Sequence, residues 1–120
     1  MESSNIAKQI IQERYCAPGE KTWEDVCNRV AKHIASREKK KDRKKYEDIY
    51  FDLMYNRIFL PASPVFFNAG LTTKGCMSPC FGLVTDDNME SIMDIATLIA
   101  QILKYGGGVC INVSNLRPKN

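Results

Sequence analysis

The sequence lacks any apolar run long enough to cross a membrane, and no apolar leader segment follows Met1. Its N-terminus is polar and charged instead. These absences argue against secretion and against a membrane partner. We therefore expect a reducing, cytoplasmic compartment, in which the five cysteines of the chain remain thiols.

The sequence also has little excess charge. Its formal net charge is +3, and much of the excess lies in residues 37–45, where seven basic residues are interrupted by two acids. Such a run usually forms the solvated face of a helix or a hinge. No interleaving of arginines with aromatic residues accompanies it, so we expect no nucleic-acid partner.

Two patterns that would indicate a bound metal or nucleotide are incomplete. Cys76 and Cys80 are not followed by a second cysteine pair at standard spacing, so we expect no metal. Residues 106–108 are three glycines, which let a ligand approach the backbone closely. They follow a predicted helix instead of opening one, which is neither a phosphate loop nor a dinucleotide fingerprint. Alone, they indicate only a helix stop and a flexible turn.

The first half of the chain has the periodicity of amphipathic helices. The 120 residues, 44 % hydrophobic, are enough for one modest domain with a core. Apolar spacing predicts helices over residues 4–15, from a Thr22 cap through Ile34, and over residues 42–57. Cys27 and His33 are expected at the surface or at the edge of the core. This half shows no catalytic constellation.

The pattern changes where prolines appear. Pro61 and Pro64 predict extended backbone, followed by a buried apolar segment at residues 65–67 and a turn at residues 68–70. Residues 80–84 then predict a short buried strand whose first residue, Cys80, carries a thiol. Pro79 precedes it and has no backbone N–H to donate to a neighbouring strand.

A helix and a second strand complete this half. Asp87 as cap with Glu90 three residues later predicts a capping box and a helix that ends at the glycines. Residues 109–113 alternate apolar with other side chains, which predicts a strand. A strand, a helix and a strand in this order predict a βαβ unit with parallel strands.

Several motifs in this order and spacing resemble the ribonucleotide reductase large-subunit family, over roughly residues 57–118. The motifs lie at residues 59–64, 68–70, 78–81, 87–92, 106–108 and 115–118. The helical lead-in, with Arg14-Tyr15 and Val30-Ala31, resembles that of the adenosylcobalamin-dependent class. The resemblance implies an α/β fold: a helical region over residues 1–57, then the first elements of an incomplete ten-stranded α/β barrel over residues 58–120.

The resemblance also implies roles for single residues. Cys80 corresponds to one of two thiols that reduce the ribose 2′-carbon and become a disulfide, which a thioredoxin-like donor reduces again. Ser63 corresponds to a residue that binds a substrate phosphate. Gly107 and Gly108 match a loop that lies against the ribose. Pro79, which stands where relatives often carry serine or alanine, joins this substrate-binding set.

Two further positions follow from the same resemblance. Asp87 and Asn88 lie where a nucleoside triphosphate effector is recognised, at the start of a helix used in dimer contacts, so a homodimer is implied. Cys110 occupies a position often held by glycine, and we expect it to be a packing residue.

The resemblance implies a reductase that makes 2′-deoxyribonucleotides for DNA synthesis by radical chemistry. The family's radical cysteine and second reducing thiol lie beyond Asn120, so we expect these residues alone to be inactive and to need the remainder of a reductase chain. Adenosylcobalamin is the implied cofactor, although no residue here is identified as binding it. Two alternatives stay open: a large subunit of the di-iron class, and a free-standing, non-catalytic dimerisation or nucleotide-binding module.

Overall fold

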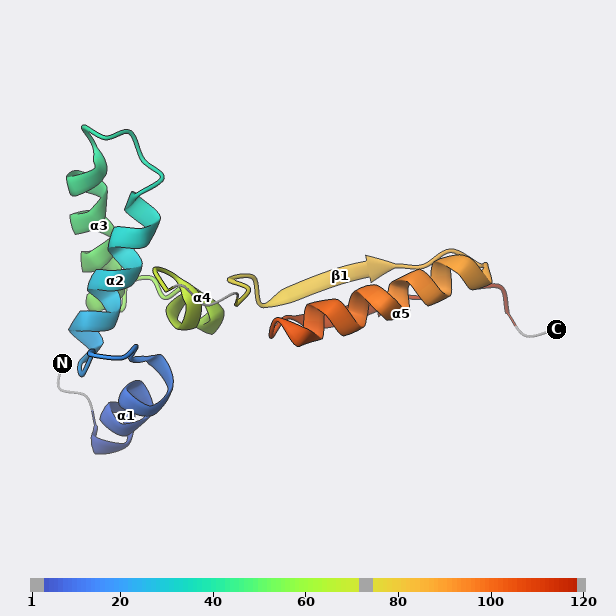
Figure 1. Ribbon diagram of the computed structural model, residues 1–120, viewed down its shortest axis with the longest axis horizontal. Coiled ribbons are helices and arrows are strands. Elements are labelled where there is room, and N and C mark those ends of the chain that lie inside the picture. The colour runs from blue at the N-terminus through green and yellow to red at the C-terminus, as the bar shows by residue number, and fades with distance from the viewer. Residues whose placement is uncertain (1–3, 72–74, 119–120) are drawn as a thin grey trace. The chain divides into compact units, whose positions relative to one another are not determined.

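The computed structural model describes residues 4–71 and 75–118. It divides into two compact units, Met1–Met77 and Ser78–Asn120, which we call the helical unit and the strand–helix–strand unit (Figure 1). The helical half followed by alternating strand and helix confirms the predicted α/β class. The predicted division between residues 57 and 58 concerns the domains of the complete protein and stays a prediction.

The helical unit contains the three predicted helices. The first is α1 (Asn5–Ile10), continued by the π-helical turn η1 (Ile11–Tyr15); the others are α2 (Trp23–Ala35) and α3 (Arg43–Tyr55). Thr22 caps α2 as predicted: its hydroxyl accepts from the Asp25 N–H at 3.2 Å, and the Asp25 carboxylate accepts from the Thr22 N–H at 2.9 Å. This reciprocal box satisfies backbone donors that the first helical turn leaves unpaired.

The core of the helical unit lies between α2, α3 and the short helix α4 (Ser63–Asn68). Cys27 is completely buried in it, so the prediction of a surface or edge position was wrong. The reason is that Cys27 lies on the same stripe as its apolar helix neighbours, one turn before Ala31. The core residues are Val26, Cys27, Val30, Ala31, Met54, Phe66 and Ala69.

Helix α4 corrects the prediction of extended backbone through Pro64. Pro64 lies in the first turn of the helix, where the backbone N–H has no intrahelical partner and the fixed φ of proline suits the helix. Extended backbone ends at the cap, Ala62. Phe66 is buried as predicted, but Phe67 is 37 % exposed. Gly70, at φ +77°, makes the predicted turn.

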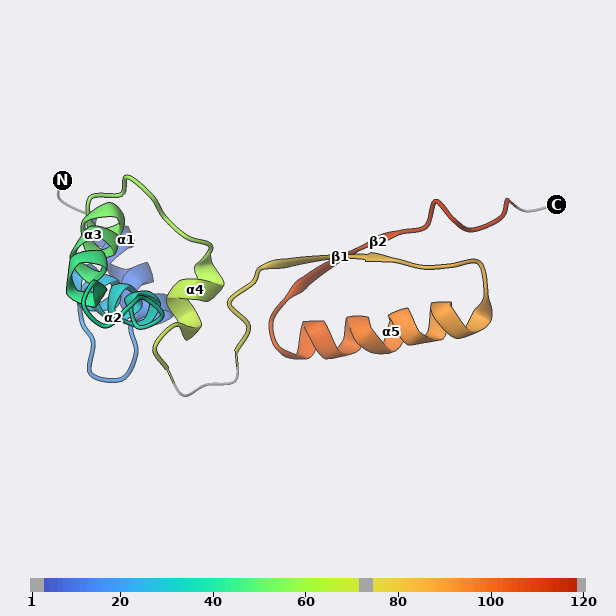
Figure 2. The same ribbon diagram turned by 90° about the horizontal axis from the view of Figure 1, so that it is seen from above.

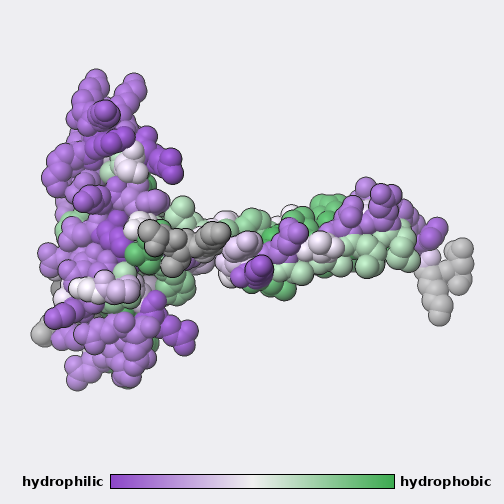
Figure 3. Space-filling model, viewed as in Figure 1, coloured by the Kyte–Doolittle hydropathy of each residue, from purple (hydrophilic) through white to green (hydrophobic). Residues whose placement is uncertain are grey.

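The strand–helix–strand unit is the predicted βαβ arrangement. Strand β1 (Cys80–Val84), helix α5 (Met89–Lys104) and strand β2 (Gly108–Asn112) follow one another, and the two strands are parallel. Figure 2 shows α5 running along one side of the strand pair. Space-filling colours show apolar residues along this unit, whereas hydrophilic residues dominate the visible face of the helical unit (Figure 3).

Strand β1 is not buried, contrary to the prediction. Phe81 and Leu83 are half-buried, whereas Cys80 and Gly82 are exposed and Val84 has an exposed fraction of 57 %. Alternate residues of a strand point to opposite faces. Because α5 covers only one face of the pair, every second residue of β1 stays open to solvent in the described structure.

The predicted cap of α5 was wrong by one residue. Asn88, and not Asp87, is the cap, and its side-chain oxygen accepts from the Ser91 N–H at 2.8 Å. Asp87 instead forms an ion pair with Arg117 at 3.4 Å between Oδ2 and Nε. Of the helices within residues 4–71 and 75–118, none is both long and apolar enough to span a bilayer.

Candidate active site

Cys80 lies at one end of the strand pair, next to the glycine loop. It is the first residue of β1, is exposed, and pairs in register with Gly108 of β2. The N–H of Gly108 donates to the carbonyl of Pro79 at 2.7 Å. The thiol therefore stands where β1 begins and where the loop enters β2.

Close packing explains two of the glycines in this loop, and backbone conformation explains the third. A Cβ on Gly107 would lie 2.6 Å from Cγ2 of Ile102 and 2.8 Å from Cε2 of Phe81, which no real side chain tolerates without movement. A Cβ on Gly108 would lie 3.2 Å from the carbonyl oxygen of Pro79. Gly106 adopts φ +83°, which favours glycine. The loop can approach Cys80 this closely because it has no side chains.

The two faces of the strand pair differ in chemistry. The close approach of a Gly107 Cβ to both Phe81 and Ile102 places Phe81 on the α5 side. Because side chains alternate along a strand and paired residues share a face, the other face carries the thiols and glycines. We call it the open face; its residues are Cys80, Gly82, Val84, Gly108, Cys110 and Asn112.

A second group of polar residues lies at the opposite end of β1. Thr85 is only 4 % exposed, and its hydroxyl contacts the carbonyl of Asp86 at 3.2 Å and the Ser91 hydroxyl at 3.4 Å. The Asp87–Arg117 pair and the Asn88 cap are at this end too. Along the chain Thr85, the nearest residue of this group, lies roughly 16 Å from Cys80, at about 3.3 Å per residue.

In the helical unit, Ser63 lines a pocket. Its hydroxyl is 3.2 Å from the Tyr15 hydroxyl, and the pocket has a volume of about 420 Å³. Arg14 supplies a positive charge to the wall. The lining residues are Ile10, Arg14, Tyr15, Ser63 and Phe67. A guanidinium and two hydroxyls around one cavity are groups that can bind an anionic oxygen.

Arg29 holds the segments around this pocket together. Its guanidinium donates to the carbonyls of Tyr15 at 3.1 Å, Phe66 at 3.0 Å and Ala69 at 2.6 Å. It also pairs with the Glu20 carboxylate at 2.7 Å and 3.2 Å, and both side chains are mostly buried, at 11 % and 15 % exposed. One side chain thus fixes the end of η1, which is Tyr15, and the C-terminal end of α4, the helix that begins at Ser63.

Burial separates inert thiols from accessible ones. Desolvation in the core raises the pKa of Cys27 to about 12, and the negative charge of Glu24 adds to the effect. Burial, and then the carboxylate of Glu20, raise the pKa of Cys16 as well. A thiol reacts as its thiolate, so these two are poor nucleophiles at neutral pH. Cys80 and Cys110 are exposed reduced thiols.

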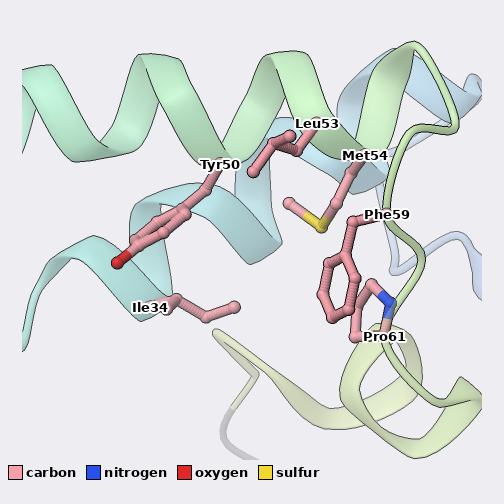
Figure 4. Close-up of a pocket in the computed structure, with 6 residues that line it drawn as sticks. All are labelled: Ile34, Tyr50, Leu53, Met54, Phe59 and Pro61. Carbon is pink, nitrogen blue, oxygen red and sulfur yellow. The ribbon is translucent and has the colours of Figure 1, made fainter.

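A second pocket, of about 180 Å³, is apolar (Figure 4). The Tyr50 hydroxyl, its polar group, donates to the Glu38 carboxylate at 3.1 Å. The side chains drawn in the figure are Ile34, Tyr50, Leu53, Met54, Phe59 and Pro61. The pocket carries no acid, base or thiol, so it does not add to the chemistry of the candidate site.

Comparison with known families decides what kind of protein this is. Residues 1–74 match the family described as "Ribonucleotide reductase, all-alpha domain", and residues 78–120 match "Ribonucleotide reductase, barrel domain". The chain belongs to the ribonucleotide reductase large-subunit family. This is an enzyme family of oxidoreductases, so the resemblance drawn from the motifs is confirmed at the level of the family.

Individual reductases show the same relationship. The chain is 34 % identical over 112 residues to "Ribonucleoside-diphosphate reductase subunit alpha" of Bacillus subtilis, which is 93 % of this chain and 14 % of the relative. It is 46 % identical over 69 residues to "Ribonucleoside-diphosphate reductase large chain" of Schizosaccharomyces pombe. This match covers 56 % of this chain and 8 % of the relative. The chain therefore spans about a seventh or less of the length of these relatives.

The reductase chain brings most of its predicted site residues into two groups. Pro79, Cys80, Gly107 and Gly108 meet at one end of the strand pair. Asp87 and Asn88 lie together at the other end. Ser63 belongs to the pocket of the helical unit. Their roles toward substrate and effector stay predictions.

Sequence reasoning missed three features of the reductase chain. Arg29 was not singled out, and the approach of Tyr15 to Ser63 joins residues that are 48 positions apart. Cys110 is exposed, so its prediction as a packing residue was wrong. The one available signal for Cys110 was the alternation of residues 109–113, which puts it on the face opposite the apolar side chains.

Adenosylcobalamin stays a prediction, since none of the described residues is identified as binding it. Within residues 4–71 and 75–118, no three His, Cys, Asp or Glu side chains gather to hold a metal ion.

Proposed function

We propose that the full natural polypeptide containing this sequence is a ribonucleoside-diphosphate reductase, with Cys80 as one of its reducing thiols. The observation that carries the proposal is an exposed thiol at the start of β1 beside a loop of three glycines. Gly82 and Gly108, which are exposed on the same face as Cys80 and have no side chain, would let a sugar ring approach the sulfur. The names of the relatives support the substrate class.

The proposed chemistry is a two-electron reduction of the ribose. The bond between the 2′-carbon and its hydroxyl oxygen breaks, a bond from this carbon to hydrogen forms, and water leaves. Cys80 and a second thiol supply the two electrons and two protons and become a disulfide. A thioredoxin-like dithiol then exchanges with that disulfide and restores both thiols.

The other predicted residues receive roles in the same proposal. Ser63 would bind a substrate phosphate, supported by Tyr15 at 3.2 Å and the positive charge of Arg14 on the same pocket. Asp87 and Asn88 would contact a nucleoside triphosphate effector. Exposed apolar residues on α5, such as Met93 at 58 % and Leu103 at 56 %, would meet a second copy of the protein.

The source of the radical separates two versions of the proposal. The helical lead-in resembles the adenosylcobalamin-dependent class, and this is the version that we propose. The second candidate needs a separate radical-generating subunit, as in the di-iron class. It is favoured by the relatives' names, since "subunit alpha" and "large chain" each denote one of several chains.

One assay tests the function and the version together. The full natural polypeptide is incubated with a ribonucleoside diphosphate and a dithiol, once with adenosylcobalamin and once with the small subunit of a di-iron reductase, and the deoxyribonucleotide is measured. Product with adenosylcobalamin alone is the expected result. Product only with the small subunit would refute the cobalamin version, and no product in either mixture would contradict the function.

A further inference from the structure

Cys110 lies on the same face of the strand pair as Cys80. In the parallel register Cys80 is opposite Gly108, and Gly82 is opposite Cys110. Residues opposite each other point to the same face, as do residues two apart on one strand. The two thiols are therefore diagonal neighbours on the open face, one strand apart and two positions along.

The two residues that stand opposite these cysteines in the register are glycines. Gly82 and Gly108 fill the other two corners of this four-residue patch, and neither carries a side chain. Sγ of Cys110 lies close enough to Gly82 that a Cβ there would be 3.8 Å away, so this sulfur leans toward the strand that carries Cys80. Both cysteines are exposed and reduced.

The separation is just outside the range of a relaxed disulfide. Parallel strands lie about 4.8 Å apart and rise about 3.3 Å per residue, so residues one strand apart and two positions along are about 8 Å apart between Cα atoms. Disulfides usually join Cα atoms about 4.4–6.8 Å apart, so bond formation would need a backbone movement of more than about 1 Å. A strained, exposed disulfide is reduced readily, and such bonds are typically regulatory rather than structural.

We propose that Cys80 and Cys110 form a dithiol site that low-molecular-weight disulfides oxidise. The Cys80 thiolate attacks the small disulfide, forms a mixed disulfide and releases one small thiol. The Cys110 thiolate then attacks the Cys80 sulfur, releases the second small thiol and closes the protein disulfide. Two electrons and two protons pass from the protein thiols to the small disulfide.

This site would regulate the protein rather than serve its turnover. With its sulfur bound to Cys110, Cys80 has no thiol to offer a substrate, and a dithiol reductant restores it. The dithiol site goes beyond the proposed function, whereas its regulatory effect rests on that function, because the effect requires Cys80 to be a reducing thiol. The register of the two cysteines, and their exposure among the described residues, do not depend on it.

Peptide mapping tests the site directly. The full natural polypeptide is treated with oxidised glutathione, its remaining thiols are alkylated, and it is cut with trypsin and then with cyanogen bromide. Trypsin releases residues 75–104 separately from residues 105–119. Cyanogen bromide, which cuts after Met77, separates Cys76 from Cys80. The expected product links the Cys80 peptide to the Cys110 peptide and disappears after dithiothreitol.

Three variants make the result decisive. Cys110→Ser should lose the Cys80–Cys110 product completely. The Cys80 peptide should then carry glutathione or a link to the second reducing thiol of the proposed function, and mass spectrometry distinguishes the two by mass. Cys80→Ser should lose both products, and Cys76→Ser should keep the link. A Cys76–Cys80 link in the wild type would overturn the proposal, as would a mixed disulfide on Cys80 that persists while Cys110 is intact.

Discussion

At the residue scale, burial decides which thiols of this reductase chain are available for chemistry. Cys27 lies in the core of the helical unit with no exposed surface, whereas Cys80 and Cys110 lie on the open face. A free thiol is therefore a packing group at Cys27 and a candidate nucleophile at Cys80 and Cys110.

Cys27 should make the stability of the helical unit fall at high pH. Its pKa in the folded chain is about 12, against an ordinary value of 9.0. Because the folded state holds the proton more tightly, the stabilisation is complete below pH 9 and is lost as the pH rises from 9 toward 12. Urea unfolding at pH 7 and pH 10, followed by helical circular dichroism, measures the loss.

The control for this prediction is Cys27→Ala, which removes the titrating group. Its stability is lower at pH 7 because a buried sulfur is lost, but the further fall between pH 7 and pH 10 should be smaller than in the wild type. An equal fall in both proteins would contradict the assignment to Cys27.

At the element scale, α5 depends on Asn88 for its cap, and Asp87 only forms a surface ion pair. Asn88→Ala should lower the free energy of unfolding of α5 by about 1 kcal/mol, since the Ser91 N–H loses its acceptor. Asp87→Ala removes a pair in which Arg117 is 80 % exposed, so its cost should be within about 0.5 kcal/mol. Hydrogen exchange of the first-turn amides measures both; the reverse order would restore Asp87 as the cap.

Arg29 is the element-scale link between η1, α2 and α4. Arg29→Met should destabilise the helical unit by about 3–5 kcal/mol, because it leaves the mostly buried Glu20 carboxylate without its cation. Lys44→Met is the matched control: the Lys44–Asp48 pair, at 2.8 Å, is 76 % and 61 % exposed, so its loss should cost less than about 1 kcal/mol. Similar losses in thermal unfolding would contradict the role given to Arg29.

The sequence predicts the local features of these elements better than their long-range ones. The Thr22 cap and the βαβ order depend on neighbouring residues, and both are confirmed. Extended backbone was wrongly predicted at Pro64, because proline breaks the interior of a helix but fits the first turn of one. The contacts of Arg29 and of Ser63 join distant segments, which periodicity does not report.

The burial of strand β1 was misjudged for a related reason. An apolar run such as Cys80–Val84 indicates which residues prefer to be buried, but not which other elements cover them. Among the described residues, α5 covers one face only. The exposed thiol of Cys110 was missed because its prediction as a packing residue came from a family position often held by glycine, and this does not indicate which elements cover the side chain.

At the scale of the whole molecule, the two units differ in how they are stabilised. The helical unit has a core of large buried side chains, whereas α5 contains no fully buried residue. Helix amides in α2 should therefore exchange with deuterium more slowly than the ladder amides of β1 and β2. Exchange followed by mass spectrometry on the 120-residue chain measures this, and equal protection in both units would contradict it.

The central claim is that Cys80 is a reducing thiol of a ribonucleotide reductase, and Cys80→Ser tests it most directly. Turnover of a ribonucleoside diphosphate by the full natural polypeptide is measured with a dithiol, using Cys76→Ser as the matched control. A serine hydroxyl cannot form a disulfide, so Cys80→Ser should yield no dithiol-dependent deoxyribonucleotide while Cys76→Ser keeps its turnover. Unchanged turnover in Cys80→Ser would contradict the account.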